Sequence, residues 1–337
     1  MSYRLIRPLL FALDPERAHN LSIAALRMTP TAHPLPADPM LESQVAGLRF
    51  PNPVGLAAGY DKDGRVAHKM HSLGFGFAEL GTLTPLAQPG NPQPRLFRLV
   101  EDRAVINRFG FNNGGQGAAA DRIARYRRPK GEGPVIGINI GANKDATAAG
   151  RGIADYVTGV TCMMPLADYL TVNISSPNTP GLRNLQYGDA LDALLKGLKA
   201  AQEKLTETHG RYVPLFIKIA PDLSEQEISS IAASLLNAKM DGVIATNTTL
   251  SRDAVEGLDH AEEAGGLSGA VLTQQAEWVT QRLSEALGRE IPIIGVGGID
   301  SAKAAQDRLN AGASLVQVYS AFIYQGPVLI KSIARAI

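Results

Sequence analysis

Two lysines stand at positions where a lysine has little ordinary structural use. Lys218 lies inside the apolar run Leu215–Pro221, and Lys62 follows the small residues Ala57–Gly59. Lys218 could instead reach the surface or pair with an acid, and Lys62 could be a solvated loop charge. A buried cation that faces a ligand can hold an anion or stabilise negative charge that develops in a reaction. We therefore take both lysines as candidate site residues.

Asparagines supply a second set of polar groups, each at a predicted strand end or in the loop that follows. They are Asn107, Asn139, Asn173, Asn178 and Asn247. An amide offers both donors and acceptors, so such a set suits a planar ring whose edge alternates C=O and N–H. A cyclic imide, a flavin and a pyrimidine ring all have this edge. Because unpaired buried polar groups cost about 1–3 kcal/mol each, we expect these amides to meet a ligand.

Small and hydroxyl residues near other strand ends allow two interpretations. Gly297-Gly298 and Tyr319-Ser320 could simply form turns, yet glycines after the last strands of a barrel commonly bring backbone N–H groups to a phosphate. Ser175-Ser176 before Pro177 could be a local hydroxyl turn. The sequence favours a phosphate site at the first two pairs and leaves the serines open at this point.

Apolar runs alternate with segments of helical length, which indicates repeated β-then-α units. We expect strands at 53–58, 77–83, 135–140, 169–175, 215–220, 242–247, 293–297 and 315–320. Helical periodicity is present at 189–206, 224–238, 271–288 and 300–311. Eight units predict an α/β fold, a (β/α)8 TIM barrel, whose site lies at the carboxyl ends of the strands. A doubly wound sheet is disfavoured because no G-x-G-x-x-G follows the first strand.

Two segments lie outside this repeat. Residues 3–28 predict two short helices, with Asp14 and Pro15 starting the second. We expect that helix to bury a face made of Ala18, Leu21, Ala25 and Leu26. Clustered prolines then suggest a stiff connector, which divides the chain into a two-helix extension, 1–40, and a barrel, 41–337. Within the barrel, 84–113 is long enough to contain a hairpin of 95–99 with 104–107.

Composition narrows the class of protein. With 33 basic and 32 acidic residues, the net charge of +1 provides no field for gripping nucleic acid. The single cysteine, Cys162, excludes a disulfide framework and suits a reducing compartment. His68 and His71 have no evident third ligand, so we expect no metal. The charge-free stretch 311–330 is interrupted by polar residues, and no export signal is evident, so we expect an enzyme that stays inside the cell.

Motifs along the whole chain resemble the dihydroorotate dehydrogenase family. They are AAGYDKDG (57–64), GTLTP (81–85), GNPQPRLFR (90–98), INRFGFNN (106–113), IGINIG (136–141), VNISSPNTPGLR (172–183), IKIAPDL (217–223), ATNTT (245–249), GGLSG (265–269), GVGGI (295–299) and VQVYSA (316–321). Serine at 176 and the residues 1–40, including DPERAH, are similar to the class 2, quinone-dependent branch, whereas the soluble branch has a catalytic cysteine and lacks the N-terminal helices.

The resemblance implies an FMN-dependent enzyme of pyrimidine biosynthesis that oxidises dihydroorotate to orotate, with one FMN per chain. The residues implied for FMN are Ala58, Gly59, Lys62, Thr82, Asn139, Asn173, Lys218, Thr246, Gly269, Gly298, Tyr319 and Ser320. Those implied for the substrate are Lys62, Asn107, Arg108, Phe109, Gly110, Phe111, Asn173, Asn178, Asn247 and Thr248. All family residues that these motifs carry are present.

The same resemblance implies a mechanism. Ser176 is the base that removes the C5 proton of dihydroorotate, with Thr179 as our candidate in its proton relay. The C6 hydride passes to N5 of FMN, and Lys218 stabilises the charge left on the flavin N1–C2=O edge. Lys62 and the asparagines orient the substrate.

Electrons would then pass to a membrane quinone, with His19 and Arg98 lining its tunnel. The N-terminal helices, which are apolar on one side and slightly basic, suit peripheral contact with the cytoplasmic face of the inner membrane. We expect a monomer. Two other classes stay open: a non-redox barrel lyase or isomerase for a phosphorylated substrate, with Lys218 forming a Schiff base, and a membrane-surface binding module without activity. The first would leave the asparagines unexplained, and the second predicts no bound flavin.

Overall fold

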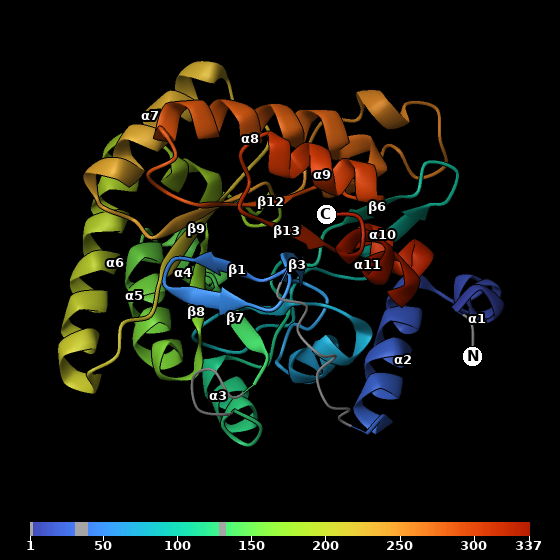
Figure 1. Ribbon diagram of the computed structural model, residues 1–337, viewed down its shortest axis with the longest axis horizontal. Helices are drawn as coiled ribbons and strands as arrows, with labels where there is room; N and C mark the ends of the chain where they lie inside the picture. Colours follow the sequence, from blue (N-terminus) through green and yellow to red (C-terminus); the bar gives the residue numbers. More distant parts are fainter. Residues whose placement is uncertain (1–2, 31–39, 128–132) are drawn as a thin grey trace.

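Eight parallel strands close into a barrel in the computed structural model, which describes residues 3–30, 40–127 and 133–337 (Figure 1). Around the barrel the strands run β10-β12-β13-β3-β4-β7-β8-β9. Their bounds are β3 Val54–Leu56, β4 Phe77–Leu83, β7 Val135–Ile140, β8 Tyr169–Asn173, β9 Leu215–Ile219, β10 Gly242–Ala245, β12 Ile293–Val296 and β13 Leu315–Val318. The predicted TIM barrel is confirmed, and several strands end earlier than predicted because their last residues already belong to the site loops.

Helices surround this barrel (Figure 1). They are α3 Gln116–Ala124, α4 Lys144–Ala148, α5 Gly152–Met163, α6 Gly188–His209, α7 Glu225–Asn237, α8 Thr273–Leu287, α9 Ala302–Asn310, α10 Ser320–Gln325 and α11 Pro327–Ala334. Short 3-10 turns are η1 Ala67–Leu73, η2 Met164–Leu166, η3 Leu182–Gln186, η4 Asp253–Val255 and η5 Ala270–Leu272. The four helices predicted by periodicity are present. One of them, α7, begins with a capping box in which Ser224 and Glu227 satisfy each other's backbone N–H groups.

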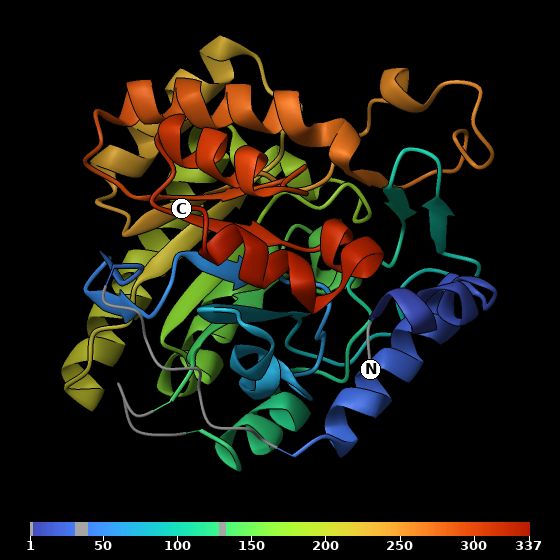
Figure 2. The same cartoon turned by 45° about the vertical axis from the view of Figure 1, so that its right-hand side comes forward.

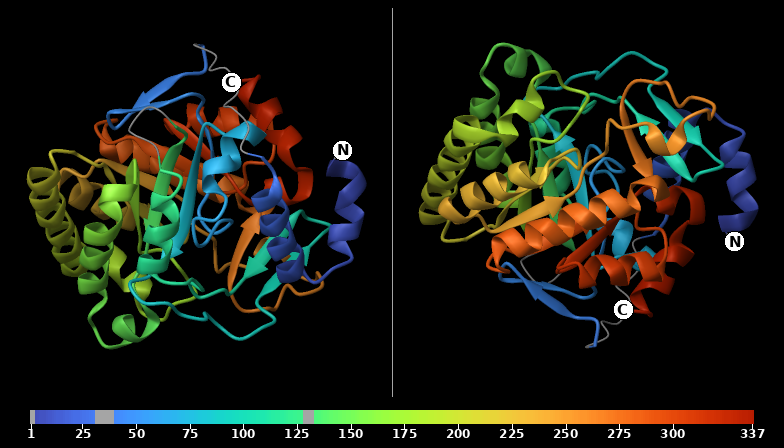
Figure 3. Two further views of the ribbon diagram at one scale, coloured as in Figure 1. Left: turned by 90° about the horizontal axis from the view of Figure 1, so that it is seen from below. Right: turned by 90° about the horizontal axis from the view of Figure 1, so that it is seen from above.

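Aromatic side chains fill the amino-terminal end of the barrel. The rings of Phe77 and Phe216 both lie edge-on to the Tyr169 ring, with centroids 6.4 Å and 5.3 Å from it. Each ring occupies the space in which a Cβ on a neighbouring strand glycine would lie, at Gly55, Gly242 or Gly137. The hairpin of β1 Ser43–Val45 and β2 Leu48–Phe50 packs over them (Figure 3). With this end closed, a ligand has room only at the carboxyl end.

A second small sheet lies beyond the carboxyl end of the barrel. The predicted hairpin is present as β5 Leu96–Leu99 and β6 Ala104–Asn107. A further strand, β11 Gly266–Gly269, pairs antiparallel with β6. The sequence did not predict β11, because GLSG carries two glycines and no alternating apolar pattern.

The N-terminal helices α1 Tyr3–Phe11 and α2 Pro15–Met28 lie beside this small sheet and α10 (Figure 2). Asp14 caps α2 by accepting the Arg17 N–H at 2.9 Å, a contact typically worth about 1 kcal/mol. At the other end of α2, the Lys69 ammonium donates to the carbonyls of Leu26, Arg27 and Thr29. This lysine fastens the end of α2 to the barrel.

The predicted buried face of α2 is wrong. Its buried residues are Glu16 and Ile23, whereas Leu21 is 51% exposed. The expected apolar residues instead line an open cavity between α2 and its neighbours. Most of the predicted connector, 31–39, lies outside the described residues. No helix in the described ranges is long and apolar enough to cross a membrane.

Candidate active site

The loops at the carboxyl ends of the strands enclose a cavity of about 1220 Å³ that opens to solvent. Nearly all the site residues predicted from the sequence line this cavity, although they come from strands and loops far apart in the chain. They are Ala58, Gly59, Lys62, Thr82, Asn107, Phe109, Gly110, Phe111, Asn173, Ser176, Asn178, Lys218, Thr246, Asn247, Thr248, Gly269, Gly298, Tyr319 and Ser320. The barrel therefore brings one polar set to one place.

Three predicted residues do not line the cavity. Asn139 is fully buried behind Thr82 and donates to Glu79 at 2.8 Å. Arg108 forms an ion pair with Glu263 at 2.5 Å, and its guanidinium lies 4.6 Å from the centre of the Phe97 ring. Thr179 is buried in the loop after β8. Their contacts with ligand stay predictions.

A chain of hydrogen bonds starts at the buried carboxylate of Glu79. The carboxylate accepts from the amide nitrogen of Asn139 at 2.8 Å, and Thr82 Oγ1 donates to the amide oxygen of Asn139 at 2.6 Å. Asn173 Nδ2 in turn donates to Thr82 Oγ1 at 3.1 Å. An amide nitrogen can only donate, so the bond from Asn139 Nδ2 to Glu79 leaves the amide oxygen of Asn139 to accept from Thr82. The orientation of the amides at Asn139 and Asn173 follows from these hydrogen bonds.

The chain continues to the loops that carry the predicted base and substrate residues. The amide oxygen of Asn173 accepts from Ser175 Oγ at 2.9 Å, and Asn247 Nδ2 donates to that hydroxyl at 2.9 Å. Glu79 also accepts from Tyr169 Oη at 3.1 Å and from Gln317 Nε2 at 2.9 Å. Glu79 is not predicted from the sequence, although a charged residue inside the apolar strand FAELGTL is the same signal that indicated Lys218.

Lys218 is a buried cation in the wall of the cavity. Its side chain is 4% exposed, and burial lowers its pKa because the charged form loses water. The negative charge of Glu79 opposes that shift. Lys218 forms no ion pair within 4 Å in the described part of the chain. Its ammonium is therefore available to a ligand.

The ammonium of Lys62 is a second cation at the cavity. Its ammonium donates to the Gly59 carbonyl at 2.9 Å and lies 4.0 Å from the centre of the Phe109 ring. Burial lowers the pKa of Lys62 to about 8, with Glu16 as the largest opposing influence. Lys62 is thus mostly protonated at neutral pH and can hold a carboxylate.

Ser176 presents a hydroxyl to the cavity from the loop after β8. It is 4% exposed, and its Oγ accepts from the Asn178 N–H at 3.2 Å. No carboxylate or imidazole hydrogen-bonds to this hydroxyl among the described residues. Proton transfer from substrate to Ser176 would therefore need a relay of hydroxyl groups or water.

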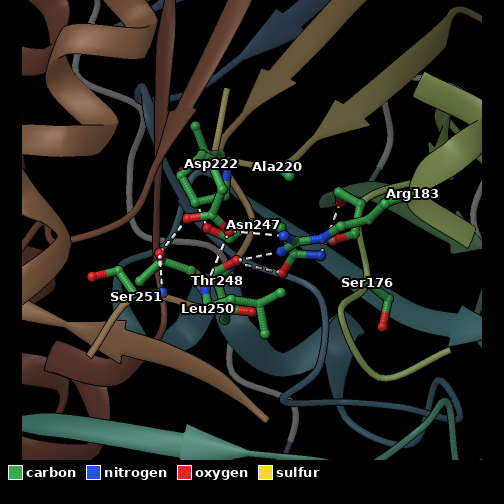
Figure 4. Close-up of polar contacts among 12 residues, drawn as sticks. Ser176, Arg183, Ala220, Asp222, Asn247, Thr248, Leu250 and Ser251 are labelled. Atoms are coloured by element: carbon green, nitrogen blue, oxygen red, sulfur yellow. Dashed lines mark hydrogen bonds and ion pairs between the residues drawn. The ribbon is translucent and has the colours of Figure 1, made fainter. Parts of the chain in front are cut away.

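One arginine ties together the loops that flank this serine (Figure 4). Arg183 Nε donates to the Ser175 carbonyl at 3.0 Å, and its Nη2 donates to the Thr248 carbonyl at 2.9 Å. Its Nη1 pairs with Asp222 at 2.7 Å, and Asp222 also accepts from the Leu250 N–H at 3.1 Å. Neither Arg183 nor Asp222 is predicted from the sequence, because the sequence does not show which loops the side chain of an arginine joins.

A second cavity, of about 1430 Å³, lies among α1, α2, the small sheet and α10. Its wall is mainly apolar, and it includes both residues predicted for the quinone tunnel, His19 and Arg98. The ring of His19 lies edge-on to Tyr60 at 5.3 Å, and Tyr60 lies edge-on to Tyr319 at 6.2 Å. Tyr319 lines both cavities. The two cavities therefore meet at this tyrosine.

His19 and Arg98, which both line the second cavity, differ in charge and in their hydrogen bonds. Burial lowers the pKa of His19 well below its usual value, and the nearby Lys62 lowers it further, so the imidazole is neutral at pH 7. The guanidinium of Arg98 donates to the carbonyls of Leu10, Phe11 and Leu13 at the end of α1. Arg98 thus also holds α1 in place. No cluster of metal-ligating side chains is present in the described ranges.

Comparisons with known proteins identify the family of this chain. The family model of dihydroorotate dehydrogenase matches residues 40–337. A dihydroorotate dehydrogenase (quinone) of Sphingopyxis alaskensis is 57% identical, covering 100% of this chain and 92% of the relative. One of Shewanella loihica is 52% identical, covering 100% and 98%.

Solved structures show the same fold. A dihydroorotate dehydrogenase of Eimeria tenella in complex with ferulenol superposes with a TM-score of 0.89 at 37% identity, covering 96% of this chain and 90% of the other. The ligand-free form gives 0.88 at 38% identity, covering 96% and 94%. Family model, full-length relatives and solved structures coincide, and the chain belongs to the dihydroorotate dehydrogenase family, in its quinone-dependent class 2.

Proposed function

We propose that this chain oxidises dihydroorotate to orotate in the barrel cavity and passes the electrons to a quinone in the second cavity. The substrate and acceptor are those in the names of its full-length relatives. The main support for the proposal is that the residues expected to bind cofactor and substrate line one cavity. Tyr319 lines both this cavity and the second, mainly apolar cavity, so the two sites are adjacent. This reaction is the oxidative step of pyrimidine (UMP) biosynthesis.

FMN, one per chain, is the proposed cofactor. The cavity suits it in three ways: a buried lysine, amides with fixed direction, and the Gln317 oxygen, which lines the cavity region and has no hydrogen-bond partner in the described part of the chain. The residues that would hold FMN are Ala58, Gly59, Lys62, Thr82, Asn139, Asn173, Lys218, Thr246, Gly269, Gly298, Tyr319 and Ser320. When bound, FMN would supply an acceptor for the C6 hydride of dihydroorotate and a donor of electrons to the quinone.

The chain's own residues bind the substrate and move its proton. Ser176 accepts the C5 proton through its hydroxyl, and Thr179 belongs to the relay that carries the proton away. The protonated Lys62 holds the substrate carboxylate, while amides of the loops orient the ring. The set proposed for substrate is Lys62, Asn107, Arg108, Phe109, Gly110, Phe111, Asn173, Asn178, Asn247 and Thr248. Lys218 stabilises negative charge that develops on the cofactor.

Arg183 should control the rate without touching the substrate. Replacing it by methionine releases the Ser175 and Thr248 carbonyls, and misplacement by about 1 Å can cost about 100-fold in rate. We expect flavin reduction to slow by about 10- to 100-fold while flavin content is kept, as measured by anaerobic stopped-flow absorbance. Arg282→Met, which removes an arginine paired with Glu285 on α8, is the matched control. Flavin reduction at the wild-type rate in Arg183→Met would contradict the role of Arg183 in holding the two loops.

The extension 1–40 is proposed as the quinone-access and membrane-contact unit on the barrel 41–337. Leu5 and Leu9 are 71% and 73% exposed, and Leu21 and Met28 are exposed as well. Exposed apolar side chains together with basic ones suit the interface of a membrane with anionic lipids. We propose that the chain is a peripheral monomer on the cytoplasmic face of the inner membrane.

The quinone placement predicts a split in kinetics. His19→Ala opens the wall of the second cavity, so we expect the quinone KM to rise while the rate of flavin reduction by dihydroorotate is unchanged. Asn20→Ala, on the exposed side of the same helix, is the control. Arg98→Met should also raise the quinone KM, although it loosens α1 as well. If neither substitution changes steady-state quinone kinetics, the tunnel lies elsewhere.

Identifying the cofactor tests the flavin proposal. Acid release from the purified chain, followed by chromatography and mass measurement, should give FMN in a ratio of one per chain. Release of FAD, or of no flavin after reconstitution, would contradict the proposed cofactor.

A further inference from the structure

A buried arginine lies behind the loop that follows β12. Arg308, on α9, has no exposed surface. Its Nη1 donates to the Val296 carbonyl at 2.9 Å, and its Nη2 donates to the carbonyls of Gly297 at 2.9 Å and Thr273 at 3.2 Å. The strand glycine Gly295 makes room for it, since a Cβ there would lie 2.4 Å from Arg308 Cγ. The fold thus holds a cation against the back of this loop.

No carboxylate neutralises that cation directly. Arg308 forms no ion pair within 4 Å in the described ranges, and only a weaker attraction to Glu277 acts on it. Burial lowers the pKa of Arg308 to about 10, which still leaves it charged at neutral pH. At the front of the loop, Asp300 is already paired with Arg103 at 3.0 Å. A buried charge without a direct counter-ion is costly, so an anion bound nearby would compensate for it.

The carbonyls held by Arg308 determine where the loop's N–H groups point. Peptide bonds 296–297, 297–298 and 298–299 are trans, so each carbonyl points away from the next N–H. The Gly297 carbonyl faces Arg308, and the Gly298 carbonyl accepts from Thr273 Oγ1 at 2.8 Å on the same side. The Val296 carbonyl accepts from Arg308 and also from the Thr246 N–H, at 2.8 Å, of the loop after β10. The N–H groups of Gly298 and Ile299 therefore point away from the arginine.

These N–H groups belong to residues that line the barrel cavity, whereas Arg308 does not line it. The loop adopts left-handed backbone at Gly297 and Gly298, with φ of 104° and 73°, so successive N–H groups can converge as an anion-binding nest. A Cβ on Gly298 would lie 2.3 Å from Thr273 Cα, so the loop packs closely against the start of α8. The result is a row of donors in front of the loop and a fixed positive charge behind it.

We propose that Arg308 is a positioning residue for the terminal phosphate of the flavin, acting through the Gly297–Gly298 loop without touching the ligand. This inference rests on FMN as the proposed cofactor. Arg308 orients the loop's N–H groups by holding its carbonyls, and its charge favours the phosphate dianion over a neutral ribityl end.

FMN and riboflavin, which differ only in the phosphate, test the proposal. Cofactor-depleted full-length chain is equilibrated with each flavin, and bound flavin is measured after ultrafiltration. Arg308→Met should raise the Kd for FMN by about tenfold or more and leave the Kd for riboflavin unchanged. Arg308→Lys, which keeps the charge, should recover part of the FMN affinity. Arg308→Gln, which keeps an amide donor for the carbonyls, serves if the methionine variant does not fold, and it should also lose FMN selectively.

Arg211→Met is the matched control. Arg211 likewise donates to backbone carbonyls, those of Pro165 and Ala167, but before strand β8 at the opposite end of the barrel. It should change neither flavin affinity selectively. An equal loss of FMN and riboflavin binding in the Arg308 variants, or no loss, would overturn the role of Arg308. A wild-type chain that binds riboflavin as well as FMN would overturn the proposed cofactor itself.

Discussion

Ser176→Ala should slow the reduction of bound flavin by dihydroorotate by about 10²- to 10⁴-fold, the usual contribution of a positioned base. The hydroxyl lies in the cavity wall, 4% exposed, and accepts one backbone N–H. Alanine keeps the loop and removes only the group that receives the C5 proton. Stopped-flow absorbance under anaerobic conditions measures the rate directly.

Binding should survive this substitution. Flavin content and the Kd of orotate are expected to match wild type, because Ser176 is not among the residues proposed to hold either ligand. Ser175→Ala is the informative contrast, since Ser175 holds the amides of Asn173 and Asn247 and should weaken orotate binding. A normal rate of reduction in Ser176→Ala would exclude Ser176 as the base.

Lys218→Met should make the two-electron midpoint potential of the bound flavin more negative. A hydrogen bond to a charged group contributes about 1.5–3 kcal/mol, and about 1.4 kcal/mol corresponds to 30 mV in such a couple. If the buried ammonium favours the reduced cofactor by about 2 kcal/mol, the potential should fall by roughly 40 mV. Equilibration with a reference dye measures the shift, and the rate of reduction should fall with it.

Another buried lysine provides the control for this measurement. Lys69 donates to three backbone carbonyls at the end of α2 and does not line the barrel cavity. Lys69→Met should lower stability without moving the potential. A potential in Lys218→Met equal to that of wild type would show that the ammonium does not act on the cofactor.

The barrel could be predicted from the sequence because its signals are local. The strand Phe77–Leu83 and the hairpin strand Ala104–Asn107 have the predicted bounds, since apolar runs and turn residues mark both. The buried face of α2 could not be predicted, because apolar residues at helical spacing can line a cavity as well as a core. The strand β11 forms only because β6 offers it an edge.

The candidate site divides in the same way. Residues in family motifs gather at one cavity as expected, since barrel strands bring their carboxyl ends together. Glu79, Arg183 and Arg308 position other site residues and could not be predicted from the sequence. Their roles depend on contacts with atoms that are distant in the chain. The Schiff-base alternative for Lys218 is not favoured, as the relatives of this chain are dehydrogenases.

An anaerobic visible spectrum of the purified chain, before and after dihydroorotate is added, tests the central claim most directly. We expect flavin absorbance that bleaches on addition of dihydroorotate and returns on addition of a quinone. A flavin that stays oxidised would be consistent with the fold and the proposed cofactor but would contradict dihydroorotate as the substrate. A chain that binds no flavin would contradict the proposed redox function as a whole.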